Sequence, residues 1–114
     1  MKYELDSKGD VKLLRILEPR LIYESLDPIQ STFIELVEAG ATKIIIDFAK
    51  VEYLDSFAVG FIMDMYRRVS TNDGQLKISG LQPRVRKILA ITRVDNVIDI
   101  HKTADEALAV FGEG

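Results

Sequence analysis

The sequence predicts an α/β fold, in which a central mixed, mostly parallel β-sheet is packed by about four helices in the order ββαβαβαβα. Short β-branched segments alternate with segments of helical apolar spacing, a pattern typical of parallel sheets. Three consecutive isoleucines at 44–46 indicate a central strand covered on both faces. An N-terminal hairpin would add an antiparallel edge strand. At 114 residues, we expect one domain spanning 1–114.

The first half of the chain begins with the hairpin. Its strands are expected at 2–6 and 11–17, with Gly9 available for the turn. Pro19 ends the second strand, because proline has no N–H to donate to a ladder. The central strand is expected at 43–48.

A helix is expected between the hairpin and the central strand. Asp27 is placed as its N-cap, Pro28 as its first residue and Gln30 as the partner in a box-like pattern. Gly40 ends it. The apolar residues at helical spacing are Ile29, Phe33, Leu36 and Val37.

The second half repeats strand and helix. Strands are expected at 75–79 and 97–100, after an Asn-Asp-Gly turn at 72–74. Helices are expected over 56–70, from Pro83, and from Thr103, which forms a capping box with Glu106. The residues expected to face inward are Ala58, Ile62, Met65, Tyr66 and Val69 in the first helix, Val85, Ile88, Leu89 and Thr92 in the second, and Ala107, Leu108 and Phe111 in the third.

Composition excludes several classes of protein. The chain has no cysteine, which rules out disulfides and thiolate sites. No apolar run approaches the roughly 20 residues that span a bilayer, and the charged N-terminus does not resemble a signal peptide. We therefore expect a cytoplasmic protein without membrane insertion. A net charge of −3 argues against a nucleic-acid partner.

The residue patterns of common catalytic sites are also absent from the sequence. The single histidine, His101, is interpreted as an exposed loop residue, because no nearby residues suggest a triad or a metal set. Asp47, Glu52 and Asp55 are interpreted as solvated carboxylates around one strand end. There is no glycine-rich phosphate loop. We expect no enzyme activity, no metal and no cofactor.

A basic patch occurs on or after the third helix. Its members are Arg84, Arg86, Lys87 and Arg93. The first three lie in the opening turns, where cations oppose the helix dipole. The patch is either a solvated helix face or an electrostatic contact for an acidic partner.

The stretch around Ser56 is the candidate functional site. Ser56 follows Asp55 at a predicted helix start, where serine is a favoured N-cap and where free N–H groups also accept an anion. Capping and phosphorylation therefore both remain possible interpretations. A helical wheel places Phe57 on the polar arc, so it is either an exposed contact or a residue folded onto the preceding loop. The candidate partner contacts are Asp55, Ser56, Phe57, Gly60, Phe61 and Asp64.

Three segments of the chain resemble the STAS family, the sulfate-transporter and anti-sigma-factor-antagonist domains. They read IIIDFAKVEYLDSFAVGF at 44–61, LQPRVRKILAITRVDNVIDI at 81–100 and DEALAVF at 105–111. The resemblance implies a STAS-like fold. It also implies that Ser56 is phosphorylated by a partner that is both serine kinase and anti-sigma factor, which binds the unphosphorylated form. A metal-dependent serine phosphatase would reset the switch.

The sequence departs from the family motif at two places. Phe57 and Ala58 replace a small residue and a glycine, and Pro19-Arg20-Leu21-Ile22 lacks the aspartate of the family's G-x-L-D segment. Both places lie where family members meet their partner. They leave open a second hypothesis, a constitutive adaptor subunit of another complex, such as a transport ATPase, in which Ser56 is only a helix cap. A small-ligand or nucleotide binder has little support without a phosphate loop.

Overall fold

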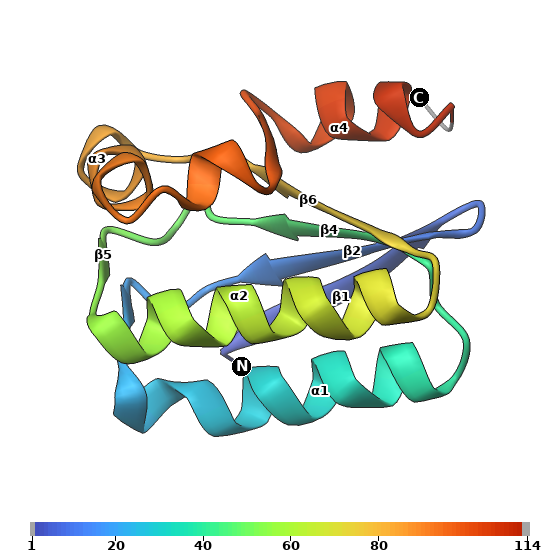
Figure 1. Ribbon diagram of the computed structural model, residues 1–114, viewed down its shortest axis with the longest axis horizontal. Helices are drawn as coiled ribbons and strands as arrows, with labels where there is room; N and C mark the ends of the chain where they lie inside the picture. Colours follow the sequence, from blue (N-terminus) through green and yellow to red (C-terminus); the bar gives the residue numbers. More distant parts are fainter. Residues whose placement is uncertain (1, 113–114) are drawn as a thin grey trace.

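The computed structural model describes residues 2–112 and is built on a five-stranded sheet of order β1-β2-β4-β6-β7 (Figure 1). The strands are β1 Tyr3–Lys8, β2 Val11–Ile16, β4 Lys43–Asp47, β6 Gln75–Ser79 and β7 Asp99–His101. β1 is antiparallel to β2, and the other neighbours are parallel. The predicted sheet, with its antiparallel hairpin strand at one edge, is confirmed.

Within residues 2–112, four α-helices surround the sheet. They are α1 Leu26–Glu38, α2 Ser56–Thr71, α3 Pro83–Ile91 and α4 Ala104–Val110. Figure 1 shows α1 and α2 side by side on one face and α4 on the opposite face. α3 lies at the end of the sheet where α2 begins. The large core lies between the sheet and α1, α2 and α3, and a smaller one lies beneath α4.

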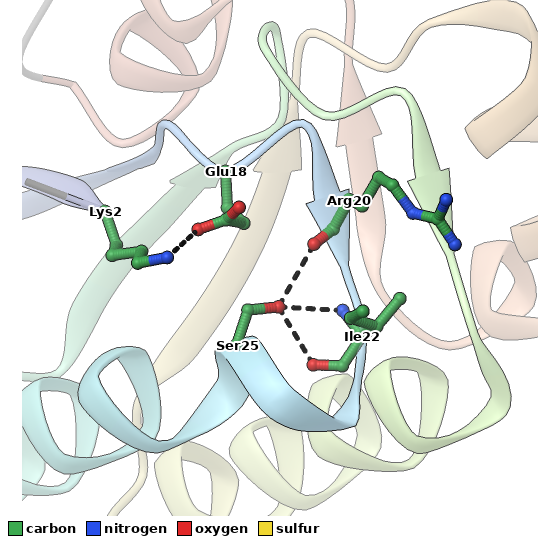
Figure 2. Close-up of polar contacts among 5 residues, drawn as sticks. All are labelled: Lys2, Glu18, Arg20, Ile22 and Ser25. Atoms are coloured by element: carbon green, nitrogen blue, oxygen red, sulfur yellow. Dashed lines mark hydrogen bonds and ion pairs between the residues drawn. The ribbon is translucent and has the colours of Figure 1, made fainter.

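The start of α1 differs from the prediction. Asp27 is not the cap, because a 3₁₀ turn at Tyr23–Ser25 precedes the helix and Leu26 is its first residue. The Ser25 hydroxyl accepts a hydrogen bond from the N–H of Ile22 at 2.9 Å and lies 3.0 Å from the carbonyl oxygen of Arg20, to which it donates (Figure 2). Figure 2 also shows the Lys2–Glu18 ion pair, which links the N-terminal segment to the segment that follows β2; its N–O distance is 2.8 Å.

A second, two-stranded sheet was not predicted. β3 (Arg20–Leu21) pairs in parallel with β5 (Tyr53–Leu54). The carbonyl oxygen of Pro19 accepts hydrogen bonds from the N–H groups of Glu52 and Tyr53. Proline at this position thus contributes an acceptor without needing a donor partner. This short pairing brings the segment before α1 against the segment before α2.

Two polar residues expected to be exposed are partly or fully inside the structure. Asp47 is only 8% exposed, lies in β4, and accepts a hydrogen bond from the Ser79 hydroxyl at 2.9 Å, so its assignment to a solvated loop is wrong. His101 lies in β7 rather than in an exposed loop. Its Nε2 atom is buried and has no hydrogen-bond partner within residues 2–112. The register explains both positions, since Asp47, Ser79 and His101 are lateral neighbours.

The C-terminal elements follow the prediction with small shifts. The Thr103 hydroxyl accepts from the N–H of Glu106 at 3.1 Å, as a capping box requires. The last strand begins at Asp99, two residues later than predicted, because a 3₁₀ turn occupies Val94–Asn96. Thr92 is exposed rather than inward, and its hydroxyl donates to the carbonyl oxygen of Ile88 at 2.8 Å.

Candidate phosphorylation and partner-binding site

Asp55 organises the start of α2. It is the N-cap in extended backbone conformation, and its Oδ1 accepts a hydrogen bond from the N–H of Ala58 at 2.9 Å. Its Oδ2 accepts a second hydrogen bond from the N–H of Tyr23 at 3.0 Å. One carboxylate therefore satisfies a free N–H of the helix and fixes a segment that lies 32 residues earlier in the chain.

The β3–β5 pairing provides the support for this contact. Leu21 and Leu54 are register partners, and both side chains are buried in the large core. The N–H of Asp55 donates to the carbonyl oxygen of Leu21 at 3.3 Å. Tyr23, two residues further on, is thereby held against the start of α2.

Ser56 is the first residue of α2 and is exposed. The expected cap at Ser56 is wrong: Asp55 has that role. Within the described part of the chain, the Ser56 hydroxyl makes no hydrogen bond. Both its accessibility and its place beside the free N–H groups of a helix start suit a group that receives a phosphate.

Two exposed aromatic rings lie next to Ser56. Phe57 is 60% exposed and Tyr23 is 62% exposed. Their ring centroids are 5.0 Å apart and their planes are inclined by 57°, a tilted pair. Phe57 is therefore exposed and is not folded into the core; its role as a partner contact stays a prediction.

Tyr23 was not predicted from the sequence. It directly follows Pro19-Arg20-Leu21-Ile22, the segment that replaces the family's G-x-L-D pattern, and the β3–β5 pairing and the long-range hydrogen bond to Asp55 place it here. The sequence does show an aromatic residue two positions after Leu21. The pairing of Leu21 with Leu54 leaves no periodic pattern in the sequence, however, so the position of Tyr23 could not be predicted from it.

The remaining candidate residues divide between surface and core. Gly60 is exposed, and Asp64 is half-buried and paired with Arg68 at 2.9 Å. Phe61 is 6% exposed and belongs to the large core, so its expected place on the surface is wrong. A helical wheel places Phe61 within about 20° of the exposed Arg68, so helical spacing alone does not predict that Phe61 is buried.

Residues 2–112 add no cluster of metal ligands to this site. Within residues 2–112, no three acidic or histidine side chains gather as metal ligands. None of the helices in the same residues is long and apolar enough to cross a bilayer.

Comparisons with known proteins agree with this architecture. A protein of Thermotoga neapolitana, provisionally named as an anti-sigma factor antagonist, is 34% identical over 76 residues, which is 67% of each chain. A STAS domain protein from Planctomyces limnophilus superposes with a TM-score of 0.88 at 20% identity, over 96% of this chain and 97% of the other.

The anti-sigma factor antagonist SpoIIAA of Bacillus has the same fold. Its phosphorylated form superposes with a TM-score of 0.76 at 20% identity, over 96% of this chain and 98% of the other. Its unphosphorylated form superposes with the same score. At these identities the superpositions establish the shared fold. The family model for the STAS domain matches residues 2–107, so the chain belongs to the STAS domain family.

Proposed function

We propose that this protein is a partner-switching regulator that captures a protein partner through the start of α2 and releases it when Ser56 is phosphorylated. The partner is proposed to be an anti-sigma factor with serine kinase activity, and a metal-dependent serine phosphatase is proposed to restore the free hydroxyl. The observation that carries this proposal is an exposed Ser56 hydroxyl with no structural role, directly beside the Tyr23–Phe57 ring pair.

The ring pair is suited to partner binding. Aromatic side chains dominate the binding energy of many interfaces, because they bury a large area while losing little rotamer freedom. Tyr23 and Phe57 present two such rings, and Asp55 fixes the backbone under both of them. The unphosphorylated form therefore offers a partly preorganised apolar contact.

Phosphorylation would change the charge of that contact. A phosphate adds about −1.5 to −2 charges at neutral pH. Burying that charge against a partner without a matching cation is costly, so the complex weakens. The Asp55 carboxylate adds to the negative charge at the site. Both of its oxygens already accept hydrogen bonds from backbone N–H groups.

Two features of the relatives support the proposal. Proteins similar to this chain carry the name anti-sigma factor antagonist, and SpoIIAA is known in a phosphorylated and an unphosphorylated form. The departure at Phe57 leaves an exposed ring that packs on Tyr23. We propose that this ring pair contributes to the choice of partner.

The test is phosphorylation by the cognate kinase. Incubated with that kinase and ATP, the protein should gain one phosphate, and peptide mapping should place it on Ser56. Ser56→Ala should bind the partner permanently, and Ser56→Asp should bind it more weakly than the wild-type protein, although aspartate carries less charge than phosphate. Ser70→Ala, an exposed serine near the other end of α2, is the matched control and should behave as wild type.

A different outcome would favour the second hypothesis. If the phosphate is found on another residue, or if both Ser56 variants bind as the wild-type protein does, switching at Ser56 is wrong. If wild type, Ser56→Ala and Ser56→Asp all bind a transport complex, the protein would be identified as a constitutive adaptor.

A further inference from the structure

We infer that the exposed face of α3 is a second protein-binding surface, which takes an acidic segment of a partner protein that carries one apolar side chain. This basic face consists of Arg84, Arg86, Lys87, Ile91 and Arg93, all exposed. The inference does not depend on phosphorylation of Ser56.

The charges on this face are concentrated and unpaired. From Gly80 to Val94 the chain has four cations and no aspartate or glutamate, although its net charge is −3. Within residues 2–112, none of the ion pairs includes any of the four. A solvated helix face usually mixes both signs along its length, so a face of one sign without partners favours an interaction surface.

Several of these cations lie where they oppose local stability. Arg84 and Arg86 lie in the first turns of α3, where positive charge opposes the helix dipole. Gln82, the N-cap residue, gives no side-chain cap and donates instead to the carbonyl oxygen of Ala49 at 2.9 Å. Arg93 has a φ of 65°, a left-handed conformation in which glycine is preferred. Such conflicts with local preference are expected at functional sites.

An apolar side chain lies among the cations. Ile91 is 72% exposed, more than any other large hydrophobic residue in the described part of the chain. Residues 84, 87 and 91 follow helical spacing, so Arg84, Lys87 and Ile91 form one stripe along α3. A partner segment with an apolar residue flanked by carboxylates would complement this stripe.

Neighbouring carboxylates limit the kind of partner. Glu52 lies beside Arg84 in the same surface hollow, and Asp95 follows Arg93 directly. A long polyanion such as DNA would meet these carboxylates at both ends of the basic face, whereas a short acidic peptide fits between them. A single exposed isoleucine is also too little apolar surface for a helix that lies in a membrane interface.

The basic face adjoins the Ser56 site. α3 packs against β5, which leads directly into Asp55, and Figure 1 shows α3 at the same end of the sheet as the start of α2. One partner can therefore contact both surfaces, and the basic face would bind its acidic segment whether or not Ser56 carries phosphate.

The experiment is an NMR titration of the ¹⁵N-labelled protein with a synthetic peptide of glutamates around a central leucine. We expect saturable chemical-shift changes of the amides at 84–93, and we expect the binding to weaken as salt is added. The double variant Arg86→Glu/Lys87→Glu should bind the peptide about tenfold more weakly or worse, because attraction becomes repulsion. A peptide with serine in place of leucine should also bind more weakly.

Controls separate this surface from non-specific charge effects and from the Ser56 site. Lys8→Glu/Arg67→Glu makes the same charge change at exposed positions outside the basic face and should leave binding unchanged. Ser56→Ala should also bind the peptide as wild type does, so a failure of switching leaves this result standing. Circular dichroism checks that each variant is folded.

Three results would overturn the inference. The first is the absence of saturable shifts at millimolar peptide. The second is an equal loss of binding in the control double variant. The third is tighter binding of a DNA duplex, or of vesicles of anionic lipid, at residues 84–93, which would assign the surface to a different class of partner.

Discussion

Replacing Asp55 with alanine should destabilise the protein more than any change at Ser56. The substitution removes the acceptor for the N–H of Ala58 and the acceptor for the N–H of Tyr23. Losing an N-cap side chain typically costs about 1 kcal/mol. The second hydrogen bond is exposed, so water partly replaces it and its loss adds about 0.5–1 kcal/mol.

The expected total for Asp55→Ala is therefore about 1.5–2 kcal/mol in the free energy of unfolding. For a domain of this size that corresponds to a fall of roughly 5–8 °C in Tm. Urea unfolding at 25 °C, followed by circular dichroism, measures it as a lower midpoint with an unchanged slope. Asp55→Asn should lower the free energy of unfolding by about half as much, because its amide keeps one acceptor oxygen. The remaining loss comes from the second hydrogen bond and from the negative charge near the helix N-terminus.

Ser56→Ala is the matched control for this prediction. Its hydroxyl makes no hydrogen bond within residues 2–112, so the loss should stay within about 0.5 kcal/mol. A larger loss for Ser56→Ala than for Asp55→Ala would assign the cap to Ser56 and refute the reasoning. A loss below about 0.5 kcal/mol for Asp55→Ala would mean that neither of its hydrogen bonds supports the fold.

Three further predictions concern other parts of the structure. Phe57→Ala should change the free energy of unfolding by less than about 1 kcal/mol and weaken partner binding by about 2 kcal/mol, because the ring is exposed. Phe61→Ala should lower the free energy of unfolding by about 3–5 kcal/mol, because this ring is buried. Urea unfolding and a binding titration distinguish the two variants, and the reverse pattern would contradict the proposed site. Gly80→Ala should lower stability by more than about 2 kcal/mol in the same unfolding assay, because φ is +74° and the new Cβ would overlap a carboxylate oxygen; a neutral result would contradict the backbone conformation described. The hydrogen bond from Lys77 and its charge lower the pKa of Asp99, so this pair stabilises the fold above a pH of about 4, and the contribution disappears as pH falls through the lowered pKa. The difference in the free energy of unfolding between wild type and Asp99→Asn should be no more than about 1 kcal/mol, because Asp99 is exposed, and it should shrink over that pH range. A difference in unfolding curves that grows toward acid pH would refute the sign of this prediction.

The sequence was sufficient to predict the main sheet because its signals are local. Alternation of apolar strands with amphipathic helices indicates parallel pairing, and Thr103 with Glu106 forms the expected capping box. The two-residue strands β3 and β5 were missed, since so short a segment has no measurable period. Their pairing depends on contacts between segments more than 30 residues apart, which no local pattern reveals.

The sequence placed the cap of α2 one residue too late, at Ser56 instead of Asp55, and that residue matters. Asp55 and Ser56 are both favoured N-caps, so local preference alone does not choose between them. The choice is made by the long-range hydrogen bond from Tyr23, which holds the Asp55 carboxylate over the helix start. Phe61 was misplaced because a helical wheel put it at the edge of the polar arc, whereas it packs into the large core.

The position of the cap bears directly on the proposed switch. If Ser56 held the helix start, adding a phosphate would remove a structural hydrogen bond as well as change the surface charge. Because Asp55 holds it instead, the proposed modification would leave the hydrogen bonds that support the backbone beneath Tyr23 and Phe57 in place. The effect of phosphate would then lie almost entirely in the interface, as the cost of burying its charge against the partner. A regulator built in this way is released from its partner without being destabilised, and removal of the phosphate restores the same binding surface without refolding.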